Sequence, residues 1–115
     1  MEAIFSRRSI RKYTNKEVTK EMIKELLKAG MVAPSAGNQQ SWEFIVIDDP
    51  KIIKTIPKIH PYSNMVPEAS KAILVCGNLE EEIHEGFWPQ DCSAATENIL
   101  LEAADKNLGA VWLGI

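Results

Sequence analysis

A run of basic side chains close to the N-terminus is the first feature of this sequence that could bind a ligand. Arg7, Arg8, Ser9 and Arg11 place three guanidinium groups and a hydroxyl within five positions. A guanidinium is a planar fork of N–H donors that matches the oxygen atoms of a phosphate. Arg7 and Arg11 are four residues apart, so they share one face if the segment is helical. The run predicts a site for a phosphate and the hydroxyl chain attached to it, and a solvated basic turn is the alternative.

A polar loop at residues 35–41, which Trp42 closes, is the second such feature. Its side chains offer a hydroxyl and three neighbouring amides, from Ser35, Asn38, Gln39 and Gln40. Amides both donate and accept hydrogen bonds, so they suit a ring edge that alternates carbonyl and N–H groups. Gly37 can adopt backbone angles that let the main chain approach a planar ligand. An exposed connector between a helix and a strand is the alternative.

Most other chemical signatures are absent from the sequence. It contains no glycine-rich dinucleotide fingerprint, no P-loop and no serine in a nucleophile elbow. His60 and His84 do not have metal-ligand spacing, and Cys76 and Cys92 are expected to be reduced and partly buried. We therefore expect no catalytic side chain and no metal site, so any reactivity would come from an organic cofactor. An anionic end joined to a ring of carbonyls and nitrogens describes flavin mononucleotide (FMN).

Composition and charge exclude several classes of partner. The 115 residues fit one domain, residues 1–115, with a net charge of −3. Residues 1–28 carry a charge of +4 and the rest −7, which favours a local anion site over a nucleic-acid surface. No apolar run reaches the roughly 20 residues of a membrane span, and there is no hydrophobic leader. We expect a cytoplasmic protein without nucleic-acid or membrane partners.

The pattern of apolar residues predicts helices that alternate with strands. Helices are expected at 2–9, at 20–32 with Thr19 as N-cap, after Asp49 and ended by Pro57, and at 91–107. Strands are expected at 42–47, 72–76 and 110–113. The first is expected to be buried on both faces because it is almost wholly apolar, and the second is also expected to be buried. This alternation predicts a mixed α and β domain.

Four segments, read together, resemble the nitroreductase family of flavin enzymes. They are Arg7-Arg8-Ser9-Ile10-Arg11-Lys12-Tyr13, the segment from Ala33 to Phe44, the segment from Asp91 to Asn98, and Trp112-Leu113-Gly114. The resemblance covers the whole chain in the order of the family. It implies an α+β fold, a nitroreductase-like α/β/α sandwich with a central, mostly antiparallel sheet. It also implies a homodimer with FMN at the subunit interface. Family members run on beyond the position of Ile115, so the chain is expected to lack their usual C-terminal portion.

The resemblance also assigns FMN contacts to particular residues. It implies that Arg7, Arg8 and Ser9 bind the phosphate and ribityl, and that Arg11 lies near the N1/O2 side of the ring. A positive charge there would stabilise the anionic reduced flavin. The loop that reaches the flavin from the other subunit corresponds to Pro34, Ser35, Asn38 and Gln40. The strand end near the N5 edge corresponds to Trp112, Leu113 and Gly114, and the helix positions expected to be structural are Asp91 and Asn98.

The expected function is that of an FMN-dependent oxidoreductase. It would pass hydride from NAD(P)H through the flavin to a small-molecule acceptor such as a nitroaromatic or a quinone, with protons from water. One alternative is a flavin-binding protein without catalysis, or an inactive truncated remnant. Another is a plain interaction domain on which the arginines form a surface patch.

Overall fold

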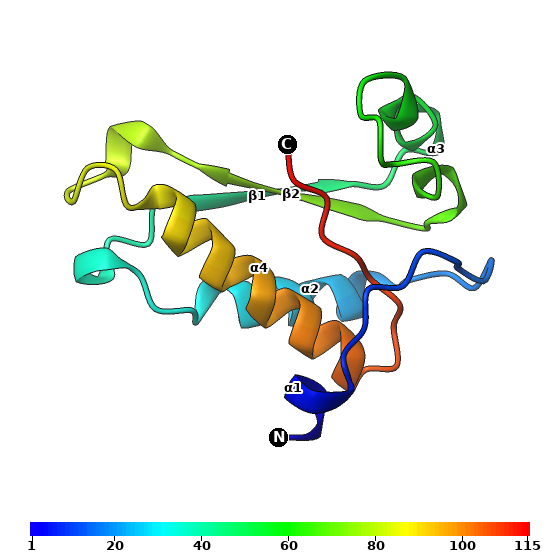
Figure 1. The fold of residues 1–115 in the computed structure, drawn as a ribbon, viewed down its shortest axis with the longest axis horizontal. Helices are drawn as coiled ribbons and strands as arrows, with labels where there is room; N and C mark the ends of the chain where they lie inside the picture. The colour runs from blue at the N-terminus through cyan, green and yellow to red at the C-terminus, as the bar shows by residue number, and fades with distance from the viewer.

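Two long helices pack against one face of a two-stranded antiparallel sheet (Figure 1). The computed structural model describes all residues, 1–115. The helices are α1 (Glu2–Ser6), α2 (Lys20–Met31), α3 (Pro50–Ile53) and α4 (Trp88–Asp105), and the strands are β1 (Trp42–Ile47) and β2 (Ala72–Gly77). Short 3-10 turns lie at Ala36–Asn38, Ile56–Lys58, Val66–Glu68 and Leu79–Glu81. None of the helices is both long and apolar enough to cross a membrane.

Helix α2 begins where the sequence predicts. The hydroxyl of Thr19 accepts a hydrogen bond of 3.2 Å from the backbone N–H of Met22, which caps the helix. Ile23 and Leu26 face the core, where they meet Ile99 and Ala103 of α4. The two helices therefore form one apolar layer beneath the sheet.

Helix α4 is offset from its predicted range at both ends. It begins at Trp88, before the predicted Asp91, because Pro89 is favourable in a first turn. It ends at Asp105, and Asn107 adopts a left-handed backbone with φ of 59°. The N–H of Leu108 donates to the carbonyl of Ala103 at 2.8 Å and closes the helix end.

The sheet is covered on one face only. In the register of the two strands, Phe44 lies opposite Val75 and Val46 opposite Ile73, and these four side chains pack on the helices. On the other face Ile45 is 52% exposed. The prediction that β1 is buried on both faces is therefore wrong, because α2 and α4 lie on the same side. The residues of β2 are half-buried throughout.

Three further predictions differ from the structure. Helix α1 ends at Ser6, and from Arg7 the chain is extended, with φ of −55° and ψ of 136° at Arg7. Helix α3 ends at Ile53, and Pro57 lies within the next 3-10 turn rather than ending a longer helix. Residues 110–113 form no strand, because a single backbone hydrogen bond, from Ile10 to Ala110, takes the place of a ladder. Both cysteines are free, as expected.

Candidate functional site

The arginine segment is an extended chain, so Arg7 and Arg11 do not share a helical face. Arg7 reaches α4, with its Nε 3.8 Å from Oε1 of Glu97. Arg8 donates through Nη1 to the carbonyls of Phe5 and Arg7, at 3.0 and 2.8 Å. The guanidinium of Arg11 is exposed and has neither a hydrogen-bond partner nor an ion-pair partner. Of the three arginines, Arg11 has the most free donors for a bound anion.

Tyr13 holds the end of this segment in place. Its hydroxyl donates a hydrogen bond of 2.7 Å to the carbonyl of Ile10. Burial raises the pKa of Tyr13, and the nearby charge of Arg11 opposes that rise. The phenol therefore stays protonated and keeps its donor role at neutral pH.

The residues after α4 run beside the arginine segment. The N–H of Ile10 donates to the carbonyl of Ala110 at 2.9 Å. The chains approach so closely that a Cβ on Gly109 would lie 2.9 Å from Cγ2 of Ile10. Arg11 and the predicted contacts Leu113 and Gly114 thus belong to neighbouring segments.

His60, which the sequence did not single out, tethers the last of these residues. Its Nε2 lies 2.7 Å from the carbonyl oxygen of Gly114, and its Nδ1 accepts a hydrogen bond of 3.2 Å from the N–H of Tyr62. Because Nδ1 accepts, the proton of the neutral ring is on Nε2, which donates to Gly114. His60 therefore fixes the position of the backbone at Gly114.

The second predicted segment, residues 35–41, folds as a strained turn. Gly37, Asn38 and Gln40 have φ of 54°, 56° and 50°. For a residue with a side chain this left-handed conformation costs about 1–2 kcal/mol. The hydroxyl of Ser35 accepts a hydrogen bond of 3.0 Å from the N–H of Gln40, which supports the turn. Pro34, Asn38 and Gln40 are exposed, and the two amide side chains have no hydrogen-bond partner.

The same loop is attached to the first turn of α4. The carboxylate of Asp91 accepts hydrogen bonds from the N–H of Ala36 at 2.9 Å and from Nε2 of Gln39 at 2.7 Å. Further along α4, Nδ2 of Asn98 donates to the carbonyl of Ala29 at 3.0 Å and joins α4 to α2. Both contacts agree with the structural roles expected for Asp91 and Asn98.

A single chain does not bring the two predicted segments together. The loop at residues 35–41 is held at the N-terminal turn of α4, whereas residues 9–13 contact the chain that follows its C-terminal end. Figure 1 shows the loop in cyan on one side and the dark blue arginine segment beside the red C-terminal segment on the other. Residues 9–13 contact Gly109 and Ala110, which precede Leu113 and Gly114, whereas Ser35, Asn38 and Gln40 lie together in the loop at the other end of α4.

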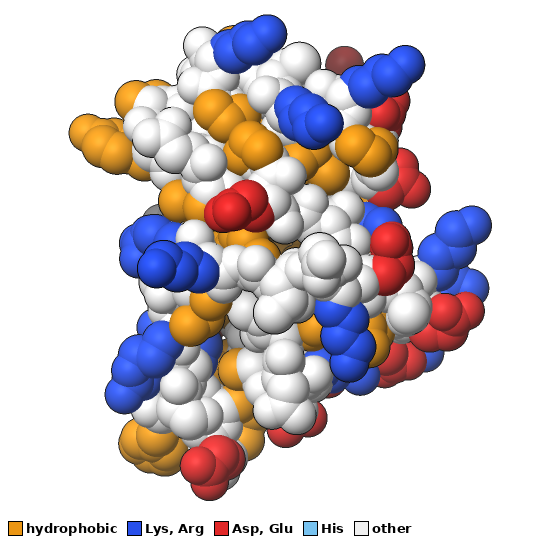
Figure 2. All heavy atoms as spheres, turned by 90° about the vertical axis from the view of Figure 1, so that its right-hand side faces the viewer, with side chains coloured by type: hydrophobic (Ala, Val, Ile, Leu, Met, Phe, Trp, Pro, Cys, Tyr) orange, Lys and Arg blue, Asp and Glu red, His pale blue; other side chains and the backbone are white.

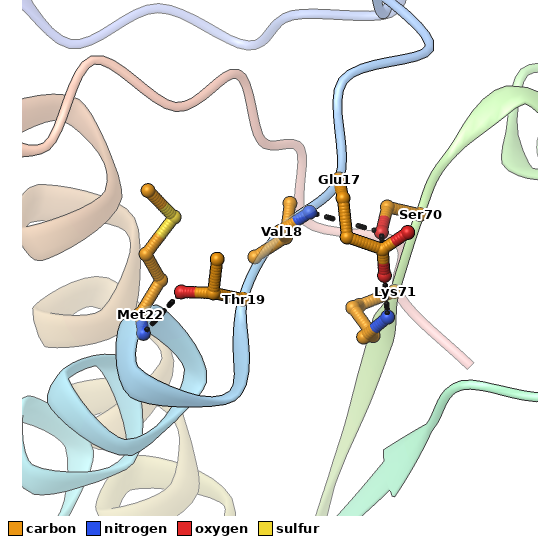
Figure 3. A network of polar contacts seen from close by, with 6 residues as sticks. All are labelled: Glu17, Val18, Thr19, Met22, Ser70 and Lys71. Carbon is orange, nitrogen blue, oxygen red and sulfur yellow. Dashed lines mark hydrogen bonds and ion pairs between the residues drawn. The ribbon is translucent and has the colours of Figure 1, made fainter.

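A separate polar cavity of about 310 Å³ contains none of the predicted site residues. Residues 14–17, 67–71 and the start of α3 contribute to its lining. At its edge Nζ of Lys71 lies 2.7 Å from Oε1 of Glu17, and the hydroxyl of Ser70 accepts a hydrogen bond from Val18 (Figure 3). The hydrogen bond and charge of Lys71 lower the pKa of Glu17. Figure 2 shows acidic and basic side chains interspersed over this side of the molecule.

Comparison with known proteins finds similar sequences over the whole chain. A model described as the nitroreductase family matches residues 4–75. A Methanothermobacter thermautotrophicus protein, provisionally named an NADH dehydrogenase/NAD(P)H nitroreductase, is 49% identical over the full chain. The chain spans 60% of the length of that relative.

Solved structures show the same similarity. A provisionally named NADH oxidase from Clostridium acetobutylicum superposes with a TM-score of 0.95 at 51% identity, covering 97% of this chain and 68% of that one. A provisionally named nitroreductase from Desulfovibrio desulfuricans, solved in complex with FMN, superposes with a TM-score of 0.91 at 41% identity. That match covers 98% of this chain and 66% of the solved one.

Proposed function

The chain belongs to the nitroreductase family and has its α+β fold, and on this premise we propose that residues 1–115 form one nitroreductase-like domain that binds FMN. The observation that carries the proposal concerns Arg11, Asn38 and Gln40. All three lie in the range that the family model matches, and all three expose polar groups that have no partner within the chain. The FMN bound to the Desulfovibrio desulfuricans relative supports the choice of cofactor.

The available donors fit the two ends of FMN. Arg7, Arg8 and Ser9 would bind its phosphate and ribityl, and guanidinium donors suit phosphate oxygens. Arg11, whose guanidinium is free, would lie near the N1/O2 side of the ring. The backbone of Leu113 and Gly114, which follows the Ile10–Ala110 hydrogen bond and is bound by His60 at Gly114, would lie near N5.

The separation of the two clusters supports a site made by two subunits. Ser35, Asn38 and Gln40 lie at the other end of α4 from Arg11 within one chain. We propose a homodimer in which one subunit contributes the arginine segment and the other contributes the loop, together with Pro34. Asn38 and Gln40 then present amides that can both donate to and accept from the flavin ring.

The proposed reaction is the oxidation of NAD(P)H coupled to reduction of a nitroaromatic, a quinone or a similar acceptor. FMN, when bound, would supply the hydride-transfer chemistry. The side chains of the protein would bind the cofactor, orient it and leave one face of its ring accessible to small molecules. The Arg11 charge would favour the anionic reduced form. No side chain of the chain is assigned as a proton donor, so protons would come from water.

Steady-state oxidation of NADH and of NADPH, with menadione as acceptor, tests this proposal. The chain incubated with FMN should oxidise one or both nucleotides faster than the same concentration of free FMN. A chain that binds FMN but oxidises neither nucleotide faster than free FMN is a flavin carrier and contradicts the enzymatic proposal. A chain that binds no FMN contradicts both.

A further inference from the structure

We infer that Gln39 and Asp91 are positioning residues, which hold the loop at residues 35–41 in the conformation that presents Asn38 and Gln40. The inference rests on the proposed function, because those two side chains are proposed to contact FMN. Gln39 and Asp91 themselves are directed away from any ligand, since their polar atoms are engaged within the chain.

The loop needs contacts with the rest of the fold to keep its conformation, because its backbone is strained. Asn38 and Gln40 both adopt positive φ, a region that residues with a side chain seldom occupy unless the surroundings impose it. The bond from the N–H of Gln40 to the hydroxyl of Ser35 is internal to the loop and does not attach it to the fold. The two ends of the loop are attached through Ala36 to Asp91 and through Ser41 to Asn78. Between them, Gln39 attaches the middle of the loop, with its side chain half-buried between two exposed neighbours.

The hydrogen-bond partners of Gln39 fix the orientation of its side-chain amide. The N–H groups of Ile83 and His84 donate to its Oε1, at 3.0 and 2.9 Å. A backbone N–H can only donate, so the amide carbonyl must face these two groups and the NH₂ is left to donate. That NH₂ donates to Oδ2 of Asp91 at 2.7 Å and, at the longer distance of 3.4 Å, to the carbonyl of His84. The NH₂ of Gln39 therefore requires a hydrogen-bond acceptor at Asp91.

Asp91 provides that acceptor from a buried position. Its residue is 4% exposed, and no cation pairs with its carboxylate. Its second oxygen accepts from the N–H of Ala36, at the start of the loop. A location in the first turn of α4 also favours a negative charge. One carboxylate thus fixes both the start of the loop and, through Gln39, the segment at residues 83–84.

Two single substitutions and their combination test this arrangement without changing the size of a side chain. Gln39→Glu places a carboxylate oxygen against Oδ2 of Asp91. Asp91→Asn can keep an acceptor for Ala36 but then places an NH₂ against the NH₂ of Gln39. The double variant Gln39→Glu/Asp91→Asn restores a donor opposite an acceptor, with the direction of the bond reversed. It also keeps the net charge of the native pair.

Amide hydrogen exchange of residues 36–41 in the flavin-free chain is the first measurement, and the dissociation constant for FMN is the second. Each single variant should exchange about tenfold or more faster over this segment and should bind FMN about tenfold or more weakly, because a buried polar contact becomes repulsive. The double variant should return toward native values in both measurements. Ile53→Val, a core change outside the loop, is the control, and it should leave exchange over 36–41 unchanged relative to the rest of the chain.

Two results would overturn the inference. One is native exchange over residues 36–41 in both single variants. The other is a double variant that is no better than the worse single variant. Because exchange is measured without FMN, it judges the positioning role even if the native chain binds no flavin, which would contradict the proposed function alone.

Discussion

The backbone N–H of Ile10 donates a hydrogen bond of 2.9 Å to the carbonyl of Ala110, one hundred residues further along the chain. This bond places the arginine segment beside the residues that follow α4. The chain then continues from Ala110 to Leu113 and to Gly114, whose carbonyl is bound by His60. One backbone hydrogen bond therefore connects the segment proposed to bind the phosphate with the segment proposed to reach the reactive edge of the ring.

Removal of the Arg11 guanidinium should weaken cofactor binding. A charge-assisted hydrogen bond contributes about 1.5–3 kcal/mol, so Arg11→Ala should raise the dissociation constant for FMN by at least tenfold. Lys24→Ala, on the solvated face of α2, is the charge-matched control and should bind FMN as the native chain does. Fluorescence titration of FMN measures both. Equal affinities of the two variants for FMN would show that Arg11 is not part of the proposed site.

Substitution of Gly37 should cost more than substitution of Gly86. Both glycines have positive φ, 54° and 89°, so alanine at either is expected to cost about 1–2 kcal/mol of unfolding free energy. A Cβ at Gly37 would in addition collide with the imidazole of His84, whereas nothing lies within 4 Å of one at Gly86. The imidazole is the end of an exposed side chain and can shift, so the further cost should stay below the ~1–3 kcal/mol of overpacking in a packed core.

Urea unfolding of the two glycine variants measures the difference. The double variant Gly37→Ala/His84→Ala should recover part of the loss, because it removes the colliding ring. Equal losses in Gly37→Ala and Gly86→Ala would mean that His84 does not constrain the loop.

Adjacent isoleucines of α3 should differ in their contribution to stability. Ile53 is 2% exposed, whereas Ile52 is 51% exposed. Ile53→Ala should lower the unfolding free energy by about 2–5 kcal/mol, because it leaves a cavity in a packed region. Ile52→Ala is the matched control in the same helix and should change the unfolding free energy by about 0.5 kcal/mol. Chemical unfolding of the two variants checks the comparison, and similar losses would argue against the observed packing of α3.

The Glu17–Lys71 pair should give a stability contribution that depends on pH. Lys71 lowers the pKa of Glu17 from its ordinary value of 4.5. A carboxyl with a lowered pKa stabilises the folded state above its unfolded pKa, and this stabilisation is lost as the pH falls through the folded pKa. Glu17→Gln should therefore be less stable than the native chain at pH 7, and the difference should vanish in acid below pH 4.5.

Glu43→Gln is the control for this pH series, because Glu43 is exposed, lies on a strand and makes no ion pair. Its stability relative to the native chain should stay constant across the same range. Thermal unfolding at a series of pH values compares the variants. A Glu17→Gln difference that does not change with pH would contradict the effect of Lys71.

Sequence patterns correctly predicted the elements that depend on residues close together in the chain. Thr19 caps α2 as expected, because the hydroxyl and the N–H that it accepts from are only three residues apart. Strand β1 begins at Trp42 and ends at Ile47, as its apolar run predicts. The exposure of Ile45 could not be predicted in this way, because a continuous apolar run does not reveal how many layers will cover it.

Features that depend on contacts between residues far apart in the chain could not be predicted from the sequence. Residues 110–113 have the composition of a strand, but whether a strand forms depends on the chain that lies beside them. Asn38, Gln39 and Gln40 are three amides in a row, and only the fold shows that Gln39 faces Asp91, 52 residues away. The contact of His60 with Gly114 spans 54 residues and left no local pattern.

Titration of FMN into the purified 115-residue chain, followed by flavin fluorescence and visible absorption, tests the central claim most directly. The account predicts a saturable change that ends near equimolar FMN, a yellow protein after removal of free flavin, and a dimer in sedimentation of the loaded chain. A chain that stays colourless after incubation with excess FMN would contradict it.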